Sequence, residues 1–245
     1  MTVLYGIRPV LEALRAADSR IERIAIERGR RSSMLEEIVR LARLRNVPVD
    51  FEEKIGLDRK SGGGRHQGVL CRLSEVELLE VEQVLEAASS PGLVLVLDGI
   101  EDPQNLGAIL RSAEVAGADG VILPSRRSAG VSAAVMRASA GAAAHVRIAR
   151  CINLRRALES LKEKGYWIVG LRGEAARPLW DVDLTAPTAL VLGSEGAGLR
   201  RRVTEGCDFL ASIPMRGKVG SYNVSVAAGI ALYECLRQRF RQLFR

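Results

Sequence analysis

The sequence predicts an α/β protein in which a mainly parallel sheet flanked by helices is preceded by a small α/β domain. From residue 92 onward, short apolar runs recur, and each is followed by a polar loop and a stretch of helical periodicity, the order expected for parallel strands joined by helices. The first 70 residues alternate between strand and helix signals over shorter distances. Of the 245 residues, 47% are hydrophobic, which is enough for a real core.

The first domain is expected to span residues 1–72. Amphipathic stretches at 7–16 and 33–45 predict helices, and the second helix can be capped by the hydroxyl of Ser32 or Ser33. A glycine-rich basic segment, residues 59–65, predicts a flexible loop that could order on RNA. Strands are predicted at 23–27, 47–51 and 67–73.

A linker is expected at residues 73–90, since this segment predicts a short acidic helix and ends in the turn sequence Ala-Ser-Ser-Pro-Gly. The second domain then spans residues 91–245. It includes an alanine-rich helix around residues 133–144. Its strands are expected at 93–97, 121–123, 166–171, 189–192 and 209–213.

The positive charge is concentrated in the second domain. The net charge is +7; residues 1–90 hold 15 Lys and Arg against 15 Asp and Glu, whereas residues 91–245 hold 21 against 14. Basic clusters at 28–31, 59–65, 200–202 and 237–245 could bind phosphates. Any one cluster is more simply explained as solvated surface charge, so only their sum favours a nucleic-acid partner.

Several other classes are disfavoured. No apolar stretch approaches the roughly 20 residues that a bilayer span requires, and the N-terminus lacks the pattern of an export signal. The four cysteines form no C-x-x-C pair, as is typical of reduced thiols, so we expect a cytoplasmic protein. The two histidines lie far apart without acidic neighbours at ligand spacing, and we expect no metal site.

Three loops at predicted strand ends carry candidate functional residues. The first loop leads from the strand ending at Asp98 into a helix that begins near Asn105. Apolar residues at 106, 109, 110 and 113 form one stripe of this helix, so Arg111 points away from the core. The simpler alternative makes Asn105 an N-cap and Arg111 an ordinary surface cation.

The second loop places three glycines around Glu195, in the sequence LGSEGAGL that ends a strand. Glycines let a ligand approach the backbone, which leaves amides free to bind it. The spacing G-x-x-G-x-G does not match the dinucleotide-binding fingerprint G-x-G-x-x-G. Taken alone, a tight turn also explains this loop.

The third loop, IPMRGKVGSYNVSVA, again connects a strand through glycines to a helix. Residues 224, 227, 228, 231, 232 and 235 follow helical spacing, and their small side chains allow close packing. Ser221 or Asn223 could simply cap this helix, which is the stronger interpretation for either residue taken singly.

Together the three segments resemble the signature motifs of the SpoU (TrmH-type) RNA 2'-O-methyltransferases of the SPOUT superfamily. The matching stretches, in order, are NLGAILRSA, LGSEGAGL and IPMRGKVGSYNVSVA. The segments YGIRPVLEAL and HQGV are similar to the ends of the ribosomal-protein-like substrate-binding domain of one group in this family. With the three motifs, these segments extend the resemblance over nearly the whole chain. By layout, the resemblance is greatest to the members that methylate a guanosine of 23S rRNA.

The resemblance implies a deep trefoil knot in the C-terminal domain, a homodimer, and S-adenosylmethionine as cofactor. It implies that residues 1–72 bind the RNA substrate and that residues 91–245 are catalytic. Gly193, Ile213 and Tyr222 would contact the cofactor largely through backbone groups. The family usually has Leu at the position of Tyr222, a change that a backbone contact should tolerate. The residues expected to line the reacting centre are Asn105, Arg111, Glu195, Ser221 and Asn223.

The expected reaction is 2'-O-methylation of a ribose in RNA, most simply a guanosine of 23S rRNA. The family account gives proton removal to the arginine matching Arg111, but a guanidinium is a poor proton acceptor. We therefore expect Arg111 to act as a cation that fixes the hydroxyl or its phosphate and stabilises developing alkoxide. The alternatives are a methyltransferase for tRNA or another rRNA site, and a non-catalytic RNA-binding or ribosome-assembly protein.

Overall fold

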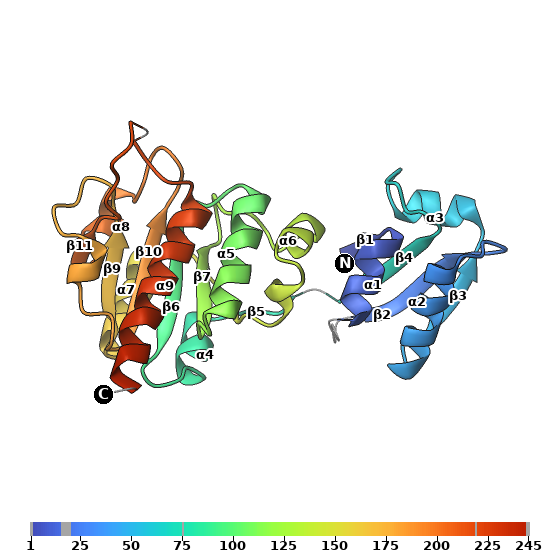
Figure 1. Cartoon of the computed structure of the whole chain (residues 1–245), viewed down its shortest axis with the longest axis horizontal. Coiled ribbons are helices and arrows are strands. Elements are labelled where there is room, and N and C mark those ends of the chain that lie inside the picture. The colour runs from blue at the N-terminus through green and yellow to red at the C-terminus, as the bar shows by residue number, and fades with distance from the viewer. Residues whose placement is uncertain (1, 16–20, 75, 219, 244–245) are drawn as a thin grey trace. The chain divides into compact units, whose positions relative to one another are not determined.

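The computed structural model describes residues 2–15, 21–74, 76–218 and 220–243. The chain forms two compact units, Met1–Val76 and Glu77–Arg245, each with its own sheet (Figure 1).

The N-terminal unit is a four-stranded sheet in the order β1-β4-β2-β3, with helices on both faces. Side chains alternate along a strand, so Ile24 and Ile26 of β2 face α1 and α2, whereas Ala25 faces α3 through Leu57. Among the strands that the structure describes, β3 pairs with β2 alone and forms one edge of this sheet. The strands are β1 (Thr2–Tyr5), β2 (Ile21–Glu27), β3 (Val49–Glu52) and β4 (Val69–Leu73). The helices are α1 (Ile7–Arg15), α2 (Ser33–Leu44) and α3 (Lys54–Lys60).

Most elements predicted for this unit are present, with shifted ends. Ser32 is the N-cap of α2, and its hydroxyl oxygen accepts a hydrogen bond from the Leu35 amide at 3.2 Å. Residue 16, the expected end of the first helix, lies outside the described residues. The loop expected at 59–65 is partly helical, because Leu57 of α3 is fully buried against the sheet and anchors a short helix there.

The C-terminal unit contains a seven-stranded, entirely parallel sheet in the order β11-β9-β10-β6-β7-β8-β5. Most of its central strands are apolar on both faces, as expected for a sheet covered on both sides. The strands are β5 (Leu78–Leu79), β6 (Leu93–Asp98), β7 (Gly120–Pro124), β8 (Ile148–Cys151), β9 (Trp167–Leu171), β10 (Thr188–Gly193) and β11 (Phe209–Ala211).

Helices cover both faces of this sheet. Val94, Val96 and Val191 pack in one cluster with α4 (Val81–Glu86), α7 (Leu154–Glu163) and α8 (Arg201–Thr204). On the other face lie α5 (Pro103–Val115) and α9 (Val224–Leu243), which pack side by side, with α6 (Ala133–Ala138) against α5 (Figure 1). Two short 3-10 turns span Ala142–Ala144 and Leu179–Asp181. The predicted mainly parallel α/β architecture is confirmed.

The segment expected as a linker, residues 73–90, contains the predicted short acidic helix as α4, whose Val84 is buried in the core, and the strand β5, which pairs with β8. Two local predictions for this part of the chain differ from the structure. The alanine-rich helix is interrupted where Ala140 and Gly141 take positive φ values of 51° and 88°. The helix expected to begin near Asn105 begins at Pro103 instead, with Asp102 as its N-cap. β8 was not predicted, since its four-residue sequence IARC carries only a weak strand signal.

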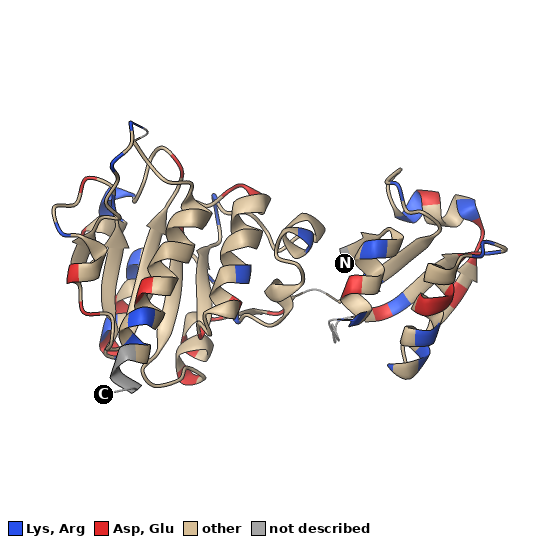
Figure 2. Ribbon diagram, viewed as in Figure 1, with Lys and Arg blue, Asp and Glu red and all other residues tan. Residues whose placement is uncertain are grey.

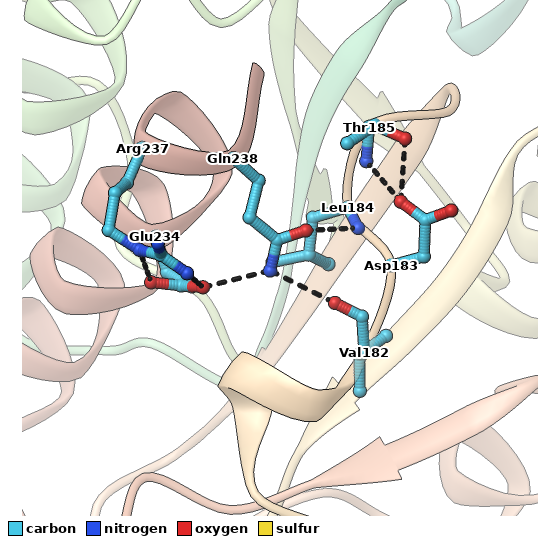
Figure 3. Close-up of polar contacts among 7 residues, drawn as sticks. All are labelled: Val182, Asp183, Leu184, Thr185, Glu234, Arg237 and Gln238. Atoms are coloured by element: carbon cyan, nitrogen blue, oxygen red, sulfur yellow. Dashed lines mark hydrogen bonds and ion pairs between the residues drawn. The ribbon is translucent and has the colours of Figure 1, made fainter. Parts of the chain in front are cut away.

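The C-terminal helix α9 is fixed to the segment before β10 by side chains (Figure 3). The Gln238 amide group donates to the Val182 carbonyl at 3.0 Å, and its oxygen accepts from the Leu184 amide at 2.9 Å. Arg239 donates to the Pro91, Gly92, Leu184 and Ala186 carbonyl oxygens. These bonds hold the C-terminal part of α9 against the segment before β10.

Candidate active site

Three polar loops meet at the carboxyl edge of the parallel sheet. In such sheets the loops after neighbouring strands lie at the same edge, where ligands bind. β6 and β10 are neighbours, and Asp98 at the end of β6 is in register with Gly193 at the end of β10. The first and second loops therefore start side by side. The third loop, residues 212–223, leads from β11 to α9 at the same edge (Figure 1).

Asn105, Glu195 and Asn223 form one hydrogen-bonded cluster. The Asn223 amide donates to Glu195 Oε1 at 2.6 Å and to Asn105 Oδ1 at 2.9 Å. The Asn105 amide donates to Glu195 Oε2 at 3.5 Å. Each residue comes from a different one of the three motifs, so three of the five residues expected at the reacting centre are brought together. Both carboxylate oxygens of Glu195 are oriented by an amide donor.

Asn223 does two things at once. Its Oδ1 accepts from the amides of Ser225 at 3.0 Å and Val226 at 3.4 Å, which are free at the start of α9. Its Nδ2 is therefore directed toward Glu195. The capping interpretation is correct for Asn223, and it is compatible with a place in the cluster. For Asn105 capping is wrong, because Asp102 accepts from the free amides of α5, including that of Asn105.

The second loop is a tight turn that only glycine allows. A Cβ atom on Gly193 would lie 2.1 Å from the Gly198 carbonyl carbon. Gly196 and Gly198 take φ values of 84° and 65°, a region that side chains disfavour. The Gly198 amide closes the turn on the Ser194 carbonyl at 2.9 Å. This turn places Glu195 at its exposed tip.

A buried carboxylate fixes the far end of the same loop. The Asp98 side chain is fully buried and accepts two hydrogen bonds from Arg200, from the backbone amide at 2.9 Å and from Nε at 2.6 Å. It also forms an ion pair with Arg200, in which Nη2 lies 2.5 Å from Oδ1. The Arg200 side chain is half exposed. The residue following LGSEGAGL is thereby clamped onto β6.

The cluster borders a cavity of about 410 Å³. Its lining brings together four carboxylates and two arginines, Arg127 and Arg200. Asp98, Arg127 and Arg200 were not predicted as site residues, although their positions could have marked them. Asp98 is the last residue of β6, Arg127 lies three residues after the end of β7, and Arg200 directly follows LGSEGAGL. The lining residues are Asp98, Gly99, Ile100, Glu101, Asp102, Asn105, Arg127, Ser194, Glu195, Ala197, Arg200 and Val224.

The other expected site residues lie outside this cavity lining. Arg111 is exposed on α5, and the apolar residues at 106, 109, 110 and 113 are fully buried beneath it, as predicted. Ser221 and Tyr222 are exposed just before α9, and Ile213 is half-buried after β11. The structure therefore does not bring Arg111 or Ser221 into the cluster.

A fourth loop, which the sequence analysis did not single out, approaches the third. Gly173 follows β9, and a Cβ there would lie 3.9 Å from both the Gly220 carbonyl oxygen and the Met215 methyl group. Cβ atoms on Gly217 or Gly220 would meet nothing within 4 Å. Glycines thus keep the backbone of these facing loops accessible. The sequence signal that could have marked this loop is a glycine two residues after the predicted strand 166–171.

Burial raises the pKa of the Cys151 and Cys207 thiols to about 11, so both are protonated near neutral pH. Within residues 2–15, 21–74, 76–218 and 220–243, no group of three His, Cys, Asp or Glu side chains is arranged to hold a metal ion. No described helix is long and apolar enough for a membrane span.

Two family models match the chain. Residues 92–233 match the SpoU rRNA Methylase family, and residues 3–79 match the domain described as RNA 2'-O ribose methyltransferase substrate binding. These ranges fall almost entirely within the two compact units.

Similar proteins cover the same length. The 23S rRNA (guanosine-2'-O-)-methyltransferase RlmB of Pseudomonas putida is 41% identical over 239 residues, 96% of each chain. RlmB of Coxiella burnetii is 44% identical over 96% of this chain and 95% of its own.

Solved structures agree. A crystal structure of an RNA 2'-O ribose methyltransferase is 28% identical, with a TM-score of 0.73, over 97% of this chain and 88% of its own. The SpoU methyltransferase AviRb from Streptomyces viridochromogenes, in complex with the cofactor AdoMet, is 25% identical, with a TM-score of 0.76, over 98% and 90%.

The parallel sheet, the polar loops at its carboxyl edge and these matches define a methyltransferase. The chain belongs to the SpoU rRNA methylase family. The resemblance seen in the three sequence motifs is thus confirmed.

Proposed function

We propose that the protein transfers a methyl group from S-adenosylmethionine to the ribose 2'-hydroxyl of a guanosine in 23S rRNA. The observation that carries this proposal is the Asn105–Glu195–Asn223 cluster, which joins all three motifs at one cavity. The substrate follows from full-length relatives named for that reaction.

The residues present fit the methyl donor. Glycines at 173, 217 and 220 leave a cradle of open backbone between facing loops, which suits a ligand held by amide and carbonyl groups. When bound, the donor supplies an electrophilic methyl group on a sulfonium. Gly193, Ile213 and Tyr222 would hold it through their backbones, and the exposed position of Tyr222 leaves room for this side chain in place of Leu.

In the proposed mechanism the chain's main task is alignment, because methyl transfer is an in-line displacement. The two amides that orient Glu195 fix its carboxylate, which then holds the ribose by accepting hydrogen bonds from its hydroxyls. Ser221 assists as a further hydroxyl partner. Arg111 keeps its proton, fixes the reacting hydroxyl or its phosphate, and stabilises the developing alkoxide. The hydroxyl proton would pass to water, and the electron pair of the broken carbon–sulfur bond would leave with the donor as the neutral thioether.

Substitution of Arg111 tests this assignment. In Arg111→Ala we expect methyl transfer to fall by about 100-fold, the usual loss when one group that stabilises an oxyanion is removed. Cofactor binding measured by calorimetry should stay unchanged. Arg156→Ala, an exposed arginine of α7 outside the cavity, is the matched control. Unchanged turnover in Arg111→Ala would end the assignment.

The substrate itself is tested by mapping ribose methylation in RNA from a deletion strain. Loss of one methylated guanosine in 23S rRNA is the expected result. Loss at a tRNA or at another rRNA site would replace the substrate. No loss at all, together with no binding of S-adenosylmethionine, would favour a non-catalytic RNA-binding or ribosome-assembly protein.

Four further parts of the proposal follow from the resemblance to the family. The RNA substrate is bound by residues 1–72, with catalysis in residues 91–245. The C-terminal domain holds a trefoil knot, the protein is a homodimer, and it acts in the cytoplasm. Sedimentation equilibrium of the full chain tests the dimer, whose mass would be twice the 26.6 kDa of one chain.

A further inference from the structure

A groove in the N-terminal unit lies between helix α2 and the edge strand β3. Its volume is about 780 Å³, within the range that holds a nucleotide-sized ligand. Ile26 and Leu35 form a buried floor, and Val39 of α2 lies above them, half-buried. The groove is therefore a built apolar trough, lined at its rim by polar side chains.

The open side of the groove carries large apolar groups. The Phe51 side chain on β3 is 53% exposed, and Leu44 at the end of α2 is 70% exposed. Exposed aromatic rings on strands are surfaces on which unpaired bases stack. Because β3 is an edge strand, no neighbouring strand covers Phe51 on that side.

The rim of the groove is strongly basic. Four arginines line it against a single carboxylate, Glu36. Figure 2 shows both basic and acidic segments on α2. One of the four, Arg30, is paired with Glu27 at 2.9 Å. For the other three, no ion pair is found among the residues that the structure describes. The arginines are Arg30, Arg31, Arg40 and Arg43.

We propose that this groove, here called the α2–β3 groove, binds an unpaired stretch of the substrate RNA, with a base stacked on Phe51 and phosphates on Arg40 and Arg43. The inference deepens the proposed function and rests on RNA being the substrate. A guanidinium group can donate two parallel hydrogen bonds to a phosphate and can also stack on a base, so the rim suits a nucleic acid. A base can reach the apolar floor and stack on the exposed ring only if it is unpaired, and the bases of a duplex are not.

The salt dependence of binding separates the two kinds of contact. We would measure binding of the full chain to a fluorescein-labelled 23S rRNA transcript by anisotropy over a range of salt concentrations. In Arg40→Ala/Arg43→Ala the slope of log K against log salt should become shallower by about 1.4, since each lost phosphate contact on a single strand removes about 0.7. In Phe51→Ala affinity should fall by about 10-fold with the slope unchanged.

Matched variants exclude general damage. Phe51→Trp keeps a ring for stacking and should restore affinity. Ile55→Ala removes an exposed apolar side chain from α3, outside the groove, and should have no effect. Arg156→Ala/Lys164→Ala removes two exposed charges from the other unit. It should change the slope less than Arg40→Ala/Arg43→Ala does.

The outcomes are decisive for the groove. Binding by Phe51→Ala and Arg40→Ala/Arg43→Ala that equals binding by the unaltered chain would overturn the proposal, even if the chain methylates the transcript. Equal competition by a duplex and a single strand of the same sequence, or by polyglutamate, would overturn it as well. If the unaltered chain binds the transcript but does not methylate it, the proposed function fails while the binding data still test the groove.

Discussion

The clamp between Asp98 and Arg200 gives a sharp stability prediction for Arg200→Ala. The Asp98 carboxylate is fully buried, and the Arg200 guanidinium supplies both its ion-pair partner and one of the two hydrogen bonds that it accepts from Arg200. Removing that group strands a buried charge with a single amide donor. Breaking a buried ion pair from one side costs about 3–5 kcal/mol, and we take about 3 kcal/mol because the Arg200 side chain is 49% exposed and water can reach the clamp.

Thermal unfolding of the full chain checks the magnitude. For a unit of this size each kcal/mol lowers Tm by about 2–4 °C, so Arg200→Ala should lower the Tm of the C-terminal unit by about 6–12 °C. The control is Arg201→Ala. This neighbour is 91% exposed and pairs with Glu205 on the surface, and its removal should leave Tm unchanged.

A second substitution tests the cause. In the Arg200→Ala background, Asp98→Asn replaces the stranded carboxylate by a neutral amide and should recover part of the lost stability. Equal Tm values for Arg200→Ala and Arg201→Ala would refute the reasoning, as would a further loss in the double variant.

Two other predictions concern packing and ionisation. In Gly193→Ala the new Cβ would lie 2.1 Å from the Gly198 carbonyl carbon, so the second loop must open. We expect the affinity for the cofactor to fall and the free energy of unfolding to drop by about 1–3 kcal/mol. Gly217→Ala is the control, because its Cβ would meet nothing within 4 Å and should change the stability little. Calorimetry and thermal melts of both variants decide this, and equal behaviour would contradict it. Burial raises the pKa of the Cys151 and Cys207 thiols from 9.0 to about 11, so iodoacetamide should label them about 100-fold more slowly in the native than in the unfolded chain at pH 8. The folded state binds these protons more tightly, so their contribution to stability is complete below pH 9 and is lost as the pH rises toward 11; equal labelling rates, or a melt insensitive to pH in that range, would contradict the assignment.

Local sequence patterns determined which segments fold and which loops matter. The apolar runs predicted most strands of the large sheet, and the stripe at 106, 109, 110 and 113 correctly oriented α5 with Arg111 exposed. These inferences succeeded because each depends on neighbours a few residues apart.

Competition between similar side chains was decided only by the folded chain. Asp102 rather than Asn105 caps α5, since its carboxylate lies within reach of the free amides, and this leaves the Asn105 side chain available for Glu195. Short elements such as β5 and β8 lack enough residues for a periodic signal, and each is held by its partner strand in the sheet.

The sequence alone determined the α/β class and the three motifs, because these depend on periodicity and spacing along the chain, and the resemblance of the motifs to a known family indicated that family. Only the tertiary structure decided that Asp98 clamps Arg200 across 102 positions, and that basic and aromatic residues of α2 and β3 line one groove. Such pairings depend on strand order and helix placement, which bring distant residues together through the free energy of the whole fold rather than through any local pattern.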